Sequence, residues 1–208
     1  GELALALQTG LNKGGMKTCG KHFPGHGFVE GDSHHVLPQD NRSLDELEAA
    51  DIMPFRRLAA AGMAAVMPAH VVYPQVDAQP AGVSSVWLNK VLRDDIGFNG
   101  VIFSDDLTME GASGAGSIKA RAQLSFDAGC DIVLVCNRPD LVDELRVDFE
   151  IPANPDLAAR WQYMANTLST ADAAAVMETA EFKAAQADVA KLATPKDVAG
   201  GVKVGEAF

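Results

Sequence analysis

The residues in this sequence best suited to moving protons or attacking a substrate are histidines and aspartates, and they gather in a few short segments. All five histidines lie in residues 21–27, 32–35 and 68–70, and a pair of aspartates lies in residues 104–109. A solvated surface would scatter such side chains along the chain. Because an imidazole can give and take a proton near neutral pH, this concentration indicates a site for chemistry.

One candidate pair is Asp32 with His34, two residues apart. In an extended segment, side chains at that spacing project to the same side. The carboxylate would then fix the tautomer of the imidazole and stabilise its protonated form, as in the histidine–carboxylate half of a catalytic triad. The alternative is that Asp32 forms a turn after Gly31 and that His34 is a surface neighbour. The residues alone leave both interpretations open.

A second candidate is the pair Asp105 and Asp106, which follows the apolar run 101–103. Two adjacent carboxylates are unfavourable at the mouth of a buried strand. Their position therefore favours a functional role as nucleophile, general base or metal ligand. The structural alternative is that Asp106 caps the following segment and Asp105 pairs with a neighbouring lysine.

Lys21 is a long cation that ends a short expected strand. It either binds an anionic or hydroxylated ligand, or extends outward as a structural charge. Its residue type does not choose between the two.

The elements that must position these residues alternate along the chain. We expect strands near residues 16–22, 64–67, 101–103 and 132–135. We expect helices over 2–11, from the capping box at Ser43 to about Ala61, from Ser84 or Ser85 to Gly97, over 117–128, from Pro139, and twice within the alanine-rich residues 155–192. Alternation with continuous apolar strands indicates a parallel sheet covered by helices, either an open sheet or part of a barrel. In both, sites lie at the C-terminal ends of the strands, where the polar segments fall.

A resemblance to a known family favours the barrel over the open sheet. Residues 21–38, KHFPGHGFVEGDSHHVLP, have the form K-H-F/G-P-G-H-G-x4-D-S-H-x3-P, and residues 67–70 and 100–112 are further similar segments in the right order. The sequence resembles glycoside hydrolase family 3, and closely its bacterial cytoplasmic β-N-acetylglucosaminidases of peptidoglycan recycling. The resemblance covers about residues 1–150, and the first motif is very specific.

The resemblance implies a role for each matching residue. Asp105 matches the catalytic nucleophile, His34 the acid/base, and Asp32 the partner of His34 on a mobile loop. Lys21 and His22 match residues that hydrogen-bond the N-acetylglucosamine ring. The implied reaction is retaining hydrolysis of the terminal β-linked N-acetylglucosamine of muropeptides (N-acetylglucosaminyl-1,6-anhydro-N-acetylmuramyl peptides), through a covalent glycosyl-aspartate intermediate. It needs no cofactor or metal.

The resemblance also implies a division of the chain. Residues 1–150 would form the C-terminal half of a (β/α)8 TIM barrel, about four βα units, and residues 151–208 a helical extension packed on or near it. The earlier barrel strands, which hold further substrate contacts, are expected to come from a missing N-terminal half. We therefore expect the 208 residues alone to be inactive, or active only beside that half.

Composition limits the partners. The net charge of −11 argues against nucleic acid, because phosphate binding needs clustered Lys and Arg. Three widely spaced cysteines fit a reducing compartment. No apolar run approaches the ~18 residues that would span a bilayer. We expect a cytoplasmic protein with a muropeptide substrate and neither nucleic-acid nor membrane partners.

Two other functions remain to be weighed. A metal-dependent barrel hydrolase would use several of the same residues as ligands: His22, His26, His34, His70 and Asp105. Against it, the histidines cluster in one long segment and Lys21 would lie beside the cation. A non-catalytic sugar-binding barrel is the other alternative, and the presence of both His34 and Asp105 favours an enzyme over it.

Overall fold

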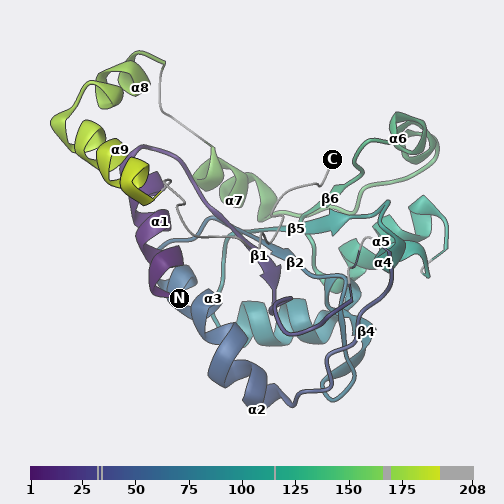
Figure 1. Ribbon diagram of the computed structural model, residues 1–208. Helices are drawn as coiled ribbons and strands as arrows, with labels where there is room; N and C mark the ends of the chain where they lie inside the picture. Colours follow the sequence, from purple (N-terminus) through teal and green to yellow (C-terminus); the bar gives the residue numbers. More distant parts are fainter. Residues whose placement is uncertain (32, 34, 115, 166–169, 193–208) are drawn as a thin grey trace. The chain divides into compact units, whose positions relative to one another are not determined.

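The computed structural model describes residues 1–31, 33, 35–114, 116–165 and 170–192 (Figure 1). Their contacts divide the chain into two compact units, Gly1–Asn166 and Thr167–Phe208. The first unit contains every strand of the described residues, together with the described residues of segments 21–27, 32–35, 68–70 and 104–109.

The first unit is built on a four-stranded parallel sheet in the order β1-β2-β5-β6. Its strands are β1 (Cys19–Phe23), β2 (Ala65–Pro68), β5 (Val101–Asp106) and β6 (Ile132–Leu134). A separate antiparallel pair, β3 (Val72–Tyr73) and β4 (Asp77–Pro80), follows β2. The four parallel strands confirm the predicted strand positions and the α/β fold class.

Helices connect the parallel strands, and Figure 1 shows them lying along the sheet. Before and between the strands run α1 (Glu2–Lys13), the continuous series α2 (Leu44–Leu47), η1 (Glu48–Ile52) and α3 (Met53–Ala60), η2 (Ala81–Val83), η3 (Val86–Asp95), α4 (Glu110–Ser113) and α5 (Ile118–Ala128). After β6 come α6 (Pro139–Arg146), α7 (Leu157–Met164), α8 (Thr170–Met177) and α9 (Ala180–Leu192). The predicted alternation of strand and helix is thus present.

Local capping explains where the first crossover helix begins and ends. The Ser43 hydroxyl accepts from the Glu46 N–H, and the Glu46 carboxylate accepts from the Ser43 N–H, which is the predicted capping box. The π-helical turn η1 lies just before Pro54, whose nitrogen cannot donate a helical hydrogen bond. The helix ends beside Gly62, whose φ of +84° suits glycine.

The core between sheet and helices is centred on aromatic side chains. Phe23 at the end of β1, Trp87 on η3 and Tyr73 on β3 are all fully buried. Phe23 and Tyr73 each pack edge-to-face against Trp87, with ring centroids 6.0 and 5.0 Å apart. These contacts join the first strand to the second crossover helix and fix the segment that follows β1.

Three features differ from the sequence-based expectation. The β3–β4 pair and the short α4 were not predicted, because two- to four-residue elements carry little periodicity. Residues 155–192 hold three described helices where two were expected. Helix α1 continues through Gly10 to Lys13, because an isolated glycine lowers helix stability without ending a helix.

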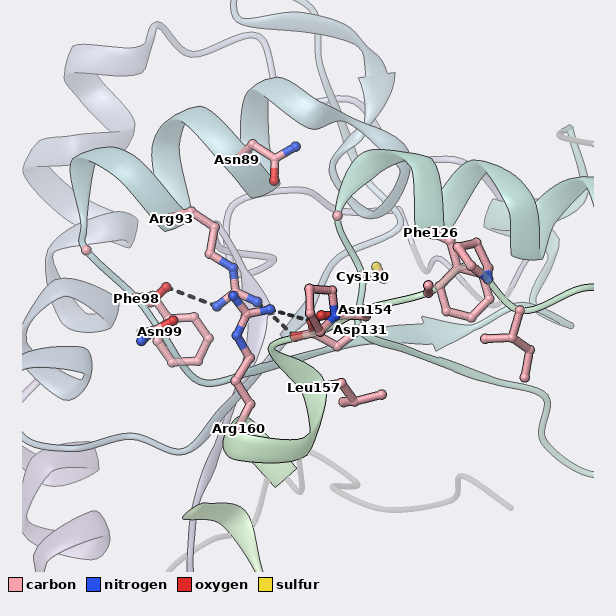
Figure 2. Close-up of a pocket in the computed structure, with 16 residues that line it drawn as sticks. Asn89, Arg93, Phe98, Asn99, Phe126, Cys130, Asp131, Asn154, Leu157 and Arg160 are labelled. Atoms are coloured by element: carbon pink, nitrogen blue, oxygen red, sulfur yellow. Dashed lines mark hydrogen bonds and ion pairs between the residues drawn. The ribbon is translucent and has the colours of Figure 1, made fainter. Parts of the chain in front are cut away.

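At the N-terminal ends of β5 and β6, one buried carboxylate joins several segments (Figure 2). The two oxygens of Asp131 accept from Arg93, Arg160, Asn154 and the Ile102 N–H, at 2.7–2.8 Å. Its side chain is only 1% exposed. This network fastens η3, β5, α7 and the loop before α7 together.

In the second unit, the described residues form α8 and α9, which contact each other. Within the parts of the chain that the structure describes, no helix combines the length and the apolar character that crossing a membrane would require.

Candidate active site

β1, β2 and β5 are parallel and adjacent, so their C-terminal ends lie together. The candidate site lies at these ends. His22 lies within the last residues of β1, His70 follows β2, and Asp105 is the penultimate residue of β5. The peptide bonds Lys21–His22 and Phe23–Pro24 are both cis. Residues far apart in the sequence therefore meet at one edge of the sheet, as the strand-end pattern predicted.

Asp105 faces His22 across this edge. The Asp105 Oδ2 lies 3.7 Å from His22 Nε2, and the two side chains are 13% and 30% exposed. The other carboxylate oxygen, Oδ1, accepts the backbone N–H of Asp106 at 2.8 Å. Asp105 thus contacts an imidazole, and not the neighbouring lysine that the structural alternative proposed. Within the part of the chain that the structure describes, Oδ2 has no hydrogen-bond donor from the backbone and can meet a substrate.

The charge state of His22 follows from its surroundings. Burial lowers the pKa of His22 below its ordinary value, and the Asp105 carboxylate opposes this effect. Lys21, His26 and His70 lower the pKa further by their positive charge. At neutral pH His22 is therefore a neutral imidazole, which can donate one hydrogen bond and accept another.

Asp106 is turned toward a different set of partners. Its Oδ1 accepts the N–H groups of Thr108 and Cys136, at 2.9 and 3.0 Å, and its Oδ2 accepts the Thr108 hydroxyl at 2.7 Å. Asp106 therefore caps the segment that follows β5, as the structural alternative for this residue proposed. The two adjacent carboxylates have separate surroundings.

Lys21 and His26 flank this arrangement. Lys21 is an exposed residue of β1, close enough to act on the charge of His22. The His26 ring lies 6.3 Å from that of His22, measured between centroids, and its Nε2 is 3.2 Å from the Ser33 hydroxyl oxygen. The carbonyl of buried Ser33 accepts the Gly111 N–H at 3.0 Å. Ser33 is thus held from both the β1 and the β5 side.

Asp32 and His34, the predicted acid/base pair, lie outside the described residues. Their assignment rests on the sequence. Ser33, between them in the sequence, is described and belongs to the same edge of the sheet through its contacts with His26 and Gly111.

The two ends of the segment between β1 and α2 are anchored by residues that the sequence-based reasoning missed. Arg42 donates to Asp40 at 2.7 Å and to Asp51 at 2.6 Å. The Tyr73 hydroxyl donates to the Gly25 carbonyl at 2.6 Å. The short spacing of Asp40 and Arg42 was the only signal in the sequence, and it resembles an ordinary surface pair.

Among the residues that the structure describes, no group of three or more His, Cys, Asp or Glu side chains is arranged to hold a metal ion. A cavity of about 620 Å³ lies at the opposite ends of the strands, lined in part by Arg93, Asp131 and Arg160. This cavity and the candidate site are therefore separate.

Comparison with known proteins assigns the family. Residues 1–152 match the family description "Glycosyl hydrolase family 3 N terminal domain". The chain belongs to glycosyl hydrolase family 3. The N-terminal domain of this family has a TIM-barrel-like fold, and the four βα units described above are consecutive units of such a fold.

The chain is similar to a β-hexosaminidase of Neisseria meningitidis serogroup C, with 77% identity over 99% of this chain and 57% of that protein. It is 56% identical to a β-hexosaminidase of Chromobacterium violaceum, again over 99% of this chain and 57% of the relative. The chain thus spans less than two thirds of the length of these curated relatives.

The chain is also similar to several solved structures. Native NagZ from Neisseria gonorrhoeae superposes with a TM-score of 0.85 at 72% identity, covering 93% of this chain and 56% of that one. The same protein in complex with N-trifluoroacetyl-D-glucosamine gives a TM-score of 0.84 at 71% identity, covering 92% and 55%. A family 3 β-N-acetylglucosaminidase from Paenibacillus gives 0.67 at 31% identity, covering 80% and 36%.

Proposed function

We propose that this chain carries the reacting groups of a retaining exo-β-N-acetylglucosaminidase that releases the terminal β-linked sugar of muropeptides in the cytoplasm. The observation that carries the proposal is the placement of Asp105, which faces a neutral imidazole with one oxygen unused by the backbone. The names of the relatives, and the glucosamine derivative bound by the gonococcal NagZ, support an amino-sugar substrate.

In the proposed mechanism Asp105 is the nucleophile. Its carboxylate attacks the anomeric carbon while His34 gives a proton to the departing glycosidic oxygen. His34 then takes a proton from water, which attacks the glycosyl-aspartate and releases the sugar. Asp32 holds the tautomer of His34. Lys21 and His22 hydrogen-bond the sugar ring, a task suited to a neutral imidazole.

An imidazole acid/base suits a negatively charged leaving group. Most retaining glycosidases use two carboxylates. A second carboxylate would repel the carboxylates of muramyl peptides, whereas a neutral or cationic imidazole does not. The same chemistry requires neither metal nor cofactor.

Because the chain covers 57% of its curated relatives, we propose that the remaining barrel strands complete the sugar pocket. The test is a chimera in which the part of the N. meningitidis relative that the match leaves uncovered precedes this chain. The chimera and the chain alone would be assayed with a nitrophenyl N-acetylglucosaminide. We expect turnover by the chimera and little or none by the chain alone.

A fluorinated substrate analogue that traps the glycosyl-enzyme would identify the nucleophile by mass spectrometry of the labelled peptide. We expect the label on Asp105 in the chimera, and no label in its Asp105→Asn variant. A label on another residue, or hydrolysis that a chelator abolishes together with a bound stoichiometric metal, would contradict the proposed mechanism.

A further inference from the structure

Asp106 makes more hydrogen bonds than a capping residue needs. Its carboxylate accepts two backbone N–H groups and one hydroxyl, from Thr108 and Cys136. Thr108 belongs to the segment after β5, and Cys136 to the segment after β6. The side chain therefore joins the C-terminal ends of two neighbouring strands.

The backbone of Asp106 is held as firmly as its side chain. Its carbonyl accepts from His70 Nε2 at 3.0 Å and from the Met109 N–H at 3.2 Å. His70 is a buried residue that follows β2, so this hydrogen bond holds the Asp106–Leu107 peptide, which is next in the chain to the peptide that carries the Asp106 N–H. The Asp106 N–H is then aimed at Asp105 Oδ1, 2.8 Å away.

These contacts make the two oxygens of Asp105 unequal. Oδ1 accepts a hydrogen bond from the N–H of Asp106, a residue whose side chain and carbonyl are held by segments after β2, β5 and β6, whereas Oδ2 faces His22 at 3.7 Å. A hydrogen bond to one oxygen fixes the rotation of the carboxylate and leaves the lone pairs of the other oxygen available.

We propose that Asp106 is a positioning residue, which holds its own N–H against Asp105 Oδ1 and thereby selects Oδ2 as the attacking atom. This inference rests on the proposed function. A lone pair of Oδ2 forms the bond to the anomeric carbon. The bond from that carbon to the glycosidic oxygen breaks, and its electron pair goes to that oxygen, which takes the proton from His34. Oδ1 becomes the carbonyl oxygen of the ester and continues to accept the Asp106 N–H.

Two substitutions in the chimera separate positioning from simple structural support. Asp106→Ala removes every acceptor of the side chain, so the peptide between residues 105 and 106 is free to turn. Asp106→Asn removes the charge but keeps an oxygen for the Thr108 and Cys136 N–H groups. We expect Asp106→Ala to lower kcat by about 10- to 100-fold, with the inhibition constant of N-acetylglucosamine unchanged, and Asp106→Asn to restore most of kcat.

Asp143→Ala is the matched control, because it removes an aspartate that is 78% exposed on α6. Its kcat should equal that of the parent. Equal losses in Asp106→Ala and Asp106→Asn, or a loss in Asp106→Ala that appears in inhibitor binding and not in kcat, would overturn the positioning role.

A second measurement does not depend on turnover. In the 208-residue chain, the pH titration of His22 can be followed by NMR and assigned with His22→Gln. The principal charges on His22 are Asp105, Lys21, His26 and His70. If Asp106 holds Asp105 in place, Asp106→Ala lowers the pH at the midpoint of the His22 titration, as Asp105→Asn does. The shift caused by Asp106→Ala should be larger than the shift caused by Asp106→Asn.

Identical midpoints for Asp106→Ala and Asp106→Asn would overturn the inference even if the chimera is active. An inactive parent chimera would count against the proposed function, while the His22 titration would still decide whether Asp106 places Asp105.

Discussion

The two ends of the parallel sheet surround an aspartate with different partners. At the N-terminal ends of β5 and β6, Asp131 is surrounded by donors from four segments, among them two guanidinium groups (Figure 2). At the C-terminal end of β5, Asp105 receives one backbone N–H and faces a neutral imidazole. Both oxygens of the first carboxylate accept hydrogen bonds within the fold, whereas among the described residues Oδ2 of the second accepts none from the backbone.

The cavity near Asp131 and the candidate site therefore lie in different regions. The cavity of about 620 Å³ borders the paired Asp131, which has no oxygen to spare. The candidate site lies at the C-terminal ends of the strands, and its mark is a carboxylate that receives one backbone N–H from the described residues and faces a histidine. Availability of a reactive atom, and not enclosed volume, distinguishes the two regions.

The largest effect should come from removing the available carboxylate. Asp105→Asn in the chimera should reduce turnover by about 1000-fold or more, equivalent to ~4 kcal/mol of transition-state stabilisation, because the amide cannot form the glycosyl-enzyme. The thermal midpoint should stay near that of the parent. If the variant retained its turnover, Asp105 would not be the reactive carboxylate, and the proposed difference between Asp105 and Asp131 would be wrong.

Removing the paired carboxylate should act on stability. Asp131→Ala removes the 1% exposed anion shared by Arg93 and Arg160, whose side chains are 14% and 15% exposed, so we expect the free energy of unfolding to fall by about 3 kcal/mol. Urea denaturation measures this. The control is Asp140→Ala, which removes an exposed partner of Arg138 and should leave the midpoint unchanged. A small effect at Asp131 would show that its network is dispensable.

An intermediate effect is expected where the core meets the segment after β1. Tyr73→Phe removes the hydrogen bond to the Gly25 carbonyl and should cost about 1 kcal/mol. Tyr163→Phe is a matched control, since the Tyr163 hydroxyl donates to the Gly62 carbonyl on an exposed side chain. Equal changes in melting temperature for the two variants would argue against a special anchoring role of Tyr73.

The smallest effect concerns pH. Burial lowers the folded-state pKa of His22 below 6.5, so the unfolded chain binds a proton there at a pH where the folded chain does not. The stability contributed by neutral His22 is therefore present above pH 6.5 and falls as the pH drops below that value. Urea midpoints at pH 7.5 and pH 5 should differ more for the parent than for His22→Gln. The opposite order would mean that Asp105 outweighs burial.

Much of the fold was predictable because its signals are local. The capping box at Ser43 and the glycines that end helices act within a few residues, so their sequence pattern is sufficient. β2 and the first residues of β5 were recognisable because strands buried on both faces are continuously apolar. The roles of Asp32 and His34 stay predictions that the sequence motif supplies.

By itself, the sequence determined the alternation of strands and helices, the family motif and the identity of the candidate nucleophile. Only the tertiary structure decided which partners each aspartate has. His22 meets Asp105 because β1 and β5 flank β2, and Asp131 meets Arg93 and Arg160 because their helices converge on the other ends of the strands. Carboxylates look alike in a sequence, and their chemistry depends on the donors that folding brings to each oxygen.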